Sequence, residues 1–214
     1  MRAKGKLVIP LDKIPEGIDL CLRNASQFCV DARVISKESS CEHALGLCLY
    51  AIEELGKAEL LQSLAASARK YGNRVITLER NKPQRFFRKE LHSYISKLGF
   101  PEEMNPFYDH RCKLFFGRQL LGLAINERIM RSLDGQKFQN FNELIQAFEE
   151  KGKDVYEIDV KEIGFREHVM YVDFDQENNE WVSGTMKFTP NEIDEMIQDI
   201  ELAIKLFNKN EKYA

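Results

Sequence analysis

The sequence predicts a mainly α-helical bundle with one antiparallel β-hairpin inserted late in the chain. Apolar residues recur at helical spacing through most of the 214 residues. A serine or threonine followed three residues later by glutamate, the signature of a capping box, marks two helix starts, at Ser39–Glu42 and Thr189–Glu192. Only residues 166–183 show β-branched and aromatic residues on both sides of a polar turn, which is typical of a hairpin.

The elements are expected in a simple order within a single domain, 1–214. The helical bundle covers about 15–152, the hairpin about 166–183 and a C-terminal helix about 190–208, with Pro190 at the first helical position. The individual helices of the bundle are expected from Pro15, from Ser39 to about Lys70 before Gly72, over 83–100, over 108–133 before Asp134 and Gly135, and over 141–152. The first helix is expected to turn Leu20, Ala25, Phe28, Ala32 and Ile35 toward the core.

Composition favours a cytoplasmic protein without a membrane span. The chain is 43% hydrophobic and 30% charged, and no apolar run reaches the length of about 18 residues that a spanning helix needs. The apolar stretch near the N-terminus is too short for a secretory signal. Five cysteines, odd in number and without a C-x-x-C pair, indicate reduced, buried thiols. No metal site and no cofactor are expected.

Charge is unevenly distributed along the chain. Residues 69–118 hold twelve Lys/Arg against five Asp/Glu, and residues 141–214 hold eight against eighteen. A basic block of this kind is typical of a polyanion-binding surface, although the two parts could equally face each other or water. Within it, Arg85, Arg88 and His92 fall on one stripe of the helix expected over 83–100.

The stretch "EELGK", residues 53–57, places charges in the middle of the most apolar helix. Glu53 and Lys57 share a sector of the helical wheel with leucines, and the opposite side is apolar too. Some of these charges should therefore be partly buried, and a buried charge without a partner costs several kcal/mol. Another helix is expected to supply the partners.

The helix over 108–133 offers suitable partners. His110 and Lys113 point with its apolar face, and Arg111 and Arg118 lie at the edge of that face. Gly117 would allow the two helices to approach closely. We therefore expect Glu53, Glu54 and Lys57 to face His110 and Lys113. A polar network that merely holds the bundle together is the alternative interpretation.

Three segments resemble the AbiV family of bacterial abortive-infection proteins, which is related to the HEPN superfamily of helical bundles. They are "ALGLCLYAIEELGKAELL", "FYDHRCKL" and "FREHVMYVDFD" with "EWVSG". The family pattern E-E-x-G-K falls on Glu53, Glu54, Gly56 and Lys57, H-x-x-K falls on His110 and Lys113, and Y-V-D falls on residues 171–173. The resemblance implies a HEPN-like bundle, a homodimer and a role in phage defence.

The resemblance leaves two functions open. Many HEPN relatives are metal-independent ribonucleases with an R-x(4–6)-H motif, which Arg85 and His92 match most nearly, away from the EELGK helix. One hypothesis is therefore an endoribonuclease acting on RNA. The alternative is a non-catalytic protein that binds a phage or host component and arrests growth or translation. A phage protein could serve as activator or target in either case.

The candidate residues of an endoribonuclease fall into two groups. Proton transfer and charge stabilisation would come from His110, Lys57, Glu53, Lys113 and Glu54. RNA binding would come from Arg85, Arg88, His92, Arg111 and Arg118. Whether His92 or His110 is the functional histidine stays open at this point.

Overall fold

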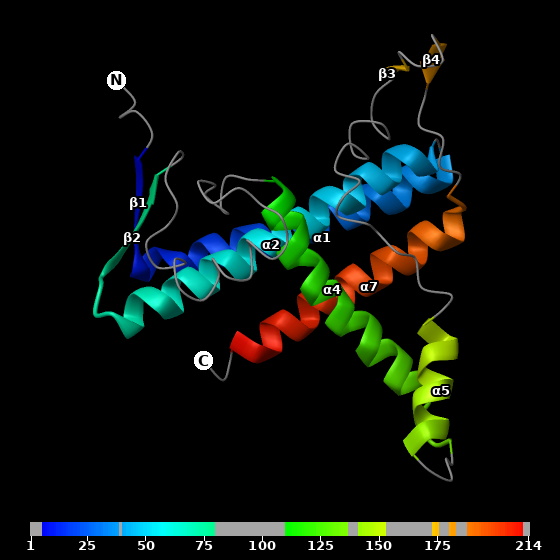
Figure 1. Cartoon of the computed structure of the whole chain (residues 1–214). Helices are drawn as coiled ribbons and strands as arrows, with labels where there is room; N and C mark the ends of the chain where they lie inside the picture. Colours follow the sequence, from blue (N-terminus) through cyan, green and yellow to red (C-terminus); the bar gives the residue numbers. More distant parts are fainter. Residues whose placement is uncertain are drawn as a thin grey trace. The chain divides into compact units, whose positions relative to one another are not determined.

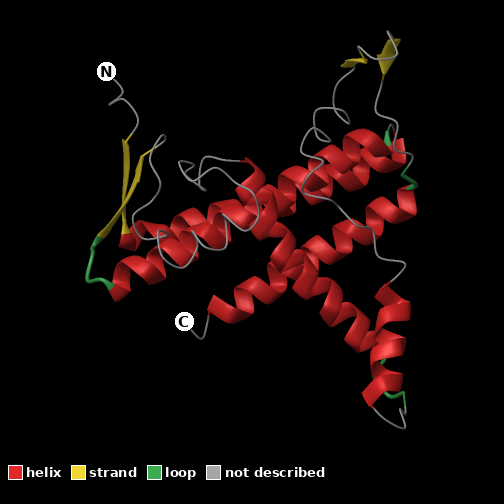
Figure 2. Cartoon of the chain, viewed as in Figure 1, coloured by secondary structure: helices red, strands yellow, loops and turns green. Residues whose placement is uncertain are grey.

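The structure is a computed structural model that describes residues 6–38, 40–79, 110–136, 141–152, 173–175, 180–182 and 188–211. Helices dominate these residues, as Figure 2 shows in red, and the predicted mainly α fold is confirmed. In chain order the elements are β1 (Lys6–Pro10), a short 3-10 helix (Leu11–Lys13), α1 (Ile14–Glu38), α2 (Cys41–Lys70), β2 (Val75–Glu79), α4 (His110–Ser132), α5 (Phe141–Gly152), β3 (Asp173–Asp175), β4 (Glu180–Val182) and α7 (Pro190–Glu211). Figure 1 labels the strands and the α-helices. The helix expected over 83–100 lies outside the described residues.

The chain divides into two compact units. One comprises Met1–Gln27 with Tyr50–Gly117, and the other comprises Phe28–Leu49 with Arg118–Ala214. The helices α1, α2 and α4 each contribute residues to both units. A single domain over 1–214 stays a prediction.

In the first unit, α1 packs directly on α2. A Cβ atom added to Gly17 would meet the Cδ1 atom of Leu61 at 3.4 Å, which is ordinary van der Waals contact. The helix α2 is buried on every side over residues 51–56, as expected from its lack of a polar face. Its central turn therefore lies inside the unit, glutamates included.

The inward face of α1 differs from the one predicted at its start. Leu20 is 48% exposed, whereas Ile18, Cys21, Leu22 and Ala25 are buried. At about 100° per residue Leu20 lies opposite Ile18 on the helix, so both cannot face α2. A single exposed leucine is common on protein surfaces and costs little.

A second two-stranded sheet was not predicted. The strands β1 and β2 pair antiparallel, with Leu7 opposite Leu78 and Ile9 opposite Ile76. Ile76 and Leu78 are fully buried, and they alternate with more exposed residues as a strand with one buried face requires. The helices α1 and α2 lie between the two strands in the chain. The sequence therefore has no tight turn from which the pairing of β1 with β2 could be predicted.

The start of α2 is shifted by one residue from the predicted start. The cap is Ser40 rather than Ser39, because the backbone N–H of His43 donates to the Ser40 hydroxyl oxygen at 3.3 Å. The Ser40 hydroxyl in turn donates to Glu42 at 2.6 Å. The end of the helix agrees with the sequence, since Gly72 follows with a φ of 69°, a conformation that glycine adopts without strain.

The predicted capping box at the start of α7 is confirmed. The Thr189 backbone N–H donates to the Glu192 carboxylate at 2.8 Å, and the Glu192 N–H donates to the Thr189 hydroxyl oxygen at 3.3 Å. Pro190 is the first helical residue, a position at which a backbone N–H would have no partner within the helix, so proline costs no hydrogen bond there.

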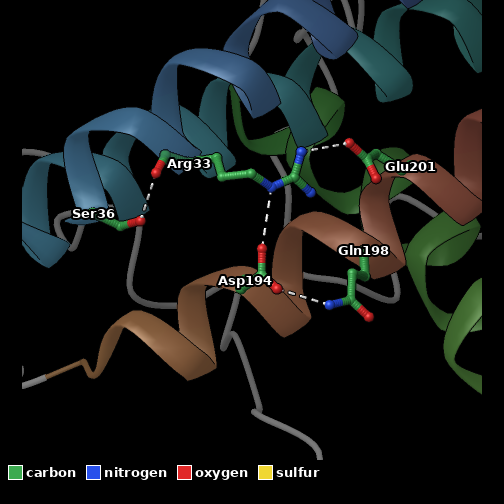
Figure 3. Close-up of polar contacts among 5 residues, drawn as sticks. All are labelled: Arg33, Ser36, Asp194, Gln198 and Glu201. Atoms are coloured by element: carbon green, nitrogen blue, oxygen red, sulfur yellow. Dashed lines mark hydrogen bonds and ion pairs between the residues drawn. The ribbon is translucent and has the colours of Figure 1, made fainter.

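Ion pairs hold α7 within the second unit. Arg33 of α1 reaches Asp194 at 3.1 Å and Glu201 at 3.0 Å, as Figure 3 shows. Arg128 of α4 makes a two-pronged contact with Asp199, at 2.7 Å and 3.0 Å, and the Asp199 side chain is fully buried. Each charge that α7 turns inward in these contacts is therefore met by an arginine.

The late hairpin is confirmed in its described part. The strands β3 and β4 pair antiparallel, with Asp173 opposite Val182 and Phe174 opposite Trp181. The residues of the turn, 176–179, lie outside the described part of the chain.

Candidate functional site

The EELGK turn of α2 meets the first two turns of α4 inside the first unit. Two glycines make this crossing unusually close. A Cβ atom on Gly56 would overlap the backbone carbonyl oxygen of Lys113, and one on Gly117 would overlap that of Ile52. Each glycine thus lies directly against the backbone of the other helix. The close approach expected at Gly117 is present, and Gly56 is its counterpart on α2.

At this crossing Glu53 and His110 form a hydrogen-bonded pair. The Nδ1 atom of His110 lies 2.7 Å from a carboxylate oxygen of Glu53. The Glu53 side chain is only 4% exposed, whereas the His110 side chain is 54% exposed. An ionised carboxylate can only accept, so Nδ1 donates and the pair fixes the orientation of the half-exposed imidazole ring.

Beside this pair, Lys57 donates a hydrogen bond to the carboxylate of Glu54. Their side chains are 29% and 12% exposed. Both Glu53, four residues before Lys57, and Glu54, three residues before it, lie within its reach along the helix, and the structure pairs Lys57 with Glu54. Glu53 bonds to His110 and Glu54 bonds to Lys57.

A third helix reaches the same charges through Cys21 of α1. The buried thiol hydrogen-bonds to Glu54 and lies within electrostatic range of Lys57 and Lys113. Burial, reinforced by the charge of Glu54 and opposed by the two lysines, raises the pKa of Cys21 to about 12. The thiol is therefore protonated near neutral pH and donates its hydrogen to the carboxylate.

The remaining predicted site residues have different placements. Lys113 is 6% exposed and joins the cluster at the α2–α4 crossing. Arg111 lies in the first turn of α4, but its side chain is outside the described part. Arg118 is partly buried and belongs to the second unit. Arg85, Arg88 and His92, the proposed RNA-binding stripe, lie outside the described residues.

We call Glu53, Glu54, Lys57, His110 and Lys113 the crossing cluster. Its two carboxylates and two ammonium groups nearly balance, and its histidine is the most exposed member. An oriented imidazole beside ammonium groups can transfer a proton and stabilise a developing negative charge. Among the described residues no group of three or more His, Cys, Asp or Glu is arranged to hold a metal ion. The catalytic and binding roles of the residues in the crossing cluster stay a prediction.

Two residues of this arrangement were missed at the sequence level. Gly56 is part of the E-E-x-G-K pattern, but its packing role becomes visible only when the facing carbonyl of Lys113 is known. Cys21 was predicted only to be one of the reduced, buried thiols, which it is. Its position on the inward stripe of α1, between Ile18 and Ala25, was the available signal that it faces α2.

Comparison with known proteins agrees with this architecture. The described part of the chain is mainly helical, as expected for a protein of the HEPN class. The family model described as AbiV matches residues 13–204, and the chain therefore belongs to the AbiV family of HEPN-like abortive-infection proteins. No curated protein and no solved structure matches the chain. In the described part of the chain, no helix has the length and apolar character to cross a membrane.

Proposed function

We propose that this AbiV-family protein is a metal-independent endoribonuclease acting in abortive infection, with His110 as its proton-transfer group. The observation that carries the proposal is the pairing of a half-exposed imidazole with a buried carboxylate, 2.7 Å from Nδ1. A bond of this kind leaves Nε2 as the nitrogen that accepts a proton, because Nδ1 is committed as a donor. If Glu53 served only to hold the two helices together, its partner would not need to be a half-exposed histidine.

The chemistry follows from what RNA cleavage without a metal requires. Nε2 of His110 takes the proton of a ribose 2′-hydroxyl as its oxygen attacks the adjacent phosphorus. The bond from phosphorus to the 5′-oxygen breaks, and that oxygen takes a proton from one of the cationic groups. In this proposal the ammonium groups of Lys57 and Lys113 supply the positive charge that stabilises the extra negative charge of the pentacovalent phosphorus. The products are a 2′,3′-cyclic phosphate and a 5′-hydroxyl.

The test compares RNA from phage-infected cells that express the wild-type protein or His110→Gln. Glutamine keeps hydrogen-bonding groups but cannot titrate near neutral pH. We expect new ends carrying 2′,3′-cyclic phosphate in the wild type, at least about 10²-fold fewer in the variant, and loss of phage protection. His43→Gln, on the exposed surface of α2, is the matched control and should behave as wild type.

The second candidate function is a non-catalytic protein that binds a phage or host component and arrests growth or translation. The observation that favours it is the near balance of charge in the crossing cluster, where Lys57 is already paired with Glu54. Full phage protection by folded His110→Gln, without new RNA ends, would support this function and contradict the first.

The expected partners belong to the same proposal. We propose a homodimer that acts on RNA and meets a phage protein as activator or target. Sedimentation of the purified protein at micromolar concentration tests the dimer, and a single monomeric species would contradict it.

A further inference from the structure

We infer that Lys57 is the residue that binds a phosphodiester oxyanion of RNA, and that Glu54 competes with this oxyanion for Lys57 in the resting protein. The inference rests on the proposed function and specifies how its site takes the substrate. It assigns opposite effects to two adjacent glutamates, because Glu53 orients the histidine and Glu54 restrains the lysine.

Exposure distinguishes the two ammonium groups of the crossing cluster. The Lys57 side chain is 29% exposed, whereas Lys113 is 6% exposed as a residue. A phosphate on a strand of RNA can therefore reach Lys57 far more readily. Lys57 also follows Glu53 by one helical turn, so it projects from the same side of α2 as the carboxylate that holds His110.

In the resting protein the ammonium group of Lys57 is bonded to Glu54. A carboxylate and a phosphodiester each carry one negative charge and accept the same kind of hydrogen bond, so they compete for one lysine. RNA binding at Lys57 thus exchanges one anion for another. The affinity for RNA is lowered by whatever free energy the pair with Glu54 contributes.

Glu54 has a second partner that remains after such an exchange. The Cys21 thiol hydrogen-bonds to Glu54, and the raised pKa of this thiol keeps its proton in place near neutral pH. The Glu54 side chain is 12% exposed. When Lys57 binds a phosphate, Glu54 therefore keeps the Cys21 thiol as a hydrogen-bond donor and keeps its position. It can pair with Lys57 again when the phosphate leaves.

The experiment measures binding of a fully 2′-O-methylated RNA oligonucleotide, which cannot be cleaved, by fluorescence anisotropy at low salt. Glu54→Gln removes the competing charge, and we expect on the order of tenfold tighter binding. Glu59→Gln is the matched control, since it removes one charge from the same helix where Glu59 contacts Ser63. In Glu54→Gln/Lys57→Met the gain should disappear, because the lysine that the gain depends on is gone.

Three results would overturn the inference: a Glu54→Gln protein that binds no tighter than Glu59→Gln, a gain that survives Lys57→Met, or no binding by any protein. Should Glu54→Gln fail to fold, Lys57→Gln decides alone, with about tenfold weaker binding expected and unchanged binding contradicting it. Cleavage of unmodified RNA is scored separately. If Glu54→Gln binds RNA more tightly but unmodified RNA is not cleaved, only the proposed ribonuclease activity is contradicted. If unmodified RNA is cleaved but Glu54→Gln binds no more tightly, only the proposed role of Glu54 is contradicted.

Discussion

The carboxylate of Glu53 and the imidazole of His110 are hydrogen-bonded although they lie 57 positions apart in the chain. One side chain is almost completely buried and the other is half exposed. The buried member fixes the position of the ring, and the exposed member presents that ring to solvent. This division of roles makes the two residues separable by mutation.

Replacing Glu53 with glutamine should abolish phage protection while the protein still folds. Glutamine fills the same space but no longer stabilises a protonated imidazole, so we expect RNA cleavage to fall by roughly 10²-fold or more. The unfolding free energy should drop by about 1–3 kcal/mol, since a buried charged hydrogen bond is lost. Plaque counts and urea unfolding check both effects, with Glu59→Gln as control. Full protection by Glu53→Gln would show that the carboxylate is not needed.

Replacing Gly117 with alanine should destabilise the protein, because the new methyl group would overlap the Ile52 carbonyl. The helices must separate, and overpacking of this kind costs about 1–3 kcal/mol. Gly122→Ala in the same helix is the control: its Cβ would meet nothing within 4 Å, so it should stabilise the helix by up to about 1 kcal/mol. Denaturant midpoints that move in the same direction for both variants would contradict the close crossing.

Arg128→Ala should be among the most destabilising single changes to a charged residue. It would strip the two-pronged partner from Asp199, whose side chain is fully buried. Breaking a buried pair from one side costs about 3–5 kcal/mol, and we expect the lower end of this range because the Arg128 side chain is itself 40% exposed. Arg131→Ala, which removes an exposed pair with Glu127, should change stability by less than about 1 kcal/mol. Thermal unfolding of the two variants, measured side by side, tests the difference.

The buried thiols should make the protein lose stability at high pH. Burial raises the pKa of Cys21 and of Cys29 to about 12, from an ordinary value of 9.0. A raised pKa in the folded state means that the stabilisation is complete below pH 9 and is lost as the pH rises toward 12. The unfolding free energy should therefore fall by up to about 1.4 kcal/mol per pH unit for each thiol.

Cys29→Ala provides the control, since it should flatten the pH dependence whatever it does to stability at neutral pH. Alkylation gives a second reading, because the thiolate is the reactive form. Rapid modification of Cys21 or Cys29 in the folded protein near neutral pH, seen by mass spectrometry, would contradict their burial.

The sequence was informative wherever the structure depends on local chemistry. The reciprocal cap of Thr189 and Glu192 and the stop at Gly72 follow from backbone groups that must be satisfied within a few residues. The same local rules fail by one residue at Ser40, because two adjacent serines offer the same hydroxyl and only the backbone path chooses between them.

Non-local features could be inferred only in part. The contact between Glu53 and His110 could be predicted because a charged group on the apolar face of one helix requires a polar partner from another helix. The pairing of Lys57 with Glu54 could not be predicted, since Glu53 and Glu54 both lie within reach of Lys57 along the helix. The role of Gly56 depends on a carbonyl of a distant helix, and no pattern around Gly56 itself reveals that neighbour.

The pairing of β1 with β2 has a consequence for any shortened form of this protein. A chain trimmed to begin at Ile14 would retain every α-helix of the described residues, yet it would lack the strand that Val75–Glu79 pairs with. The backbone groups of β2 on that side would then lose their partners, beside the buried Ile76 and Leu78. An open strand edge of this kind can pair with other chains, so we expect the shortened protein to aggregate more readily than one that keeps Lys6–Pro10.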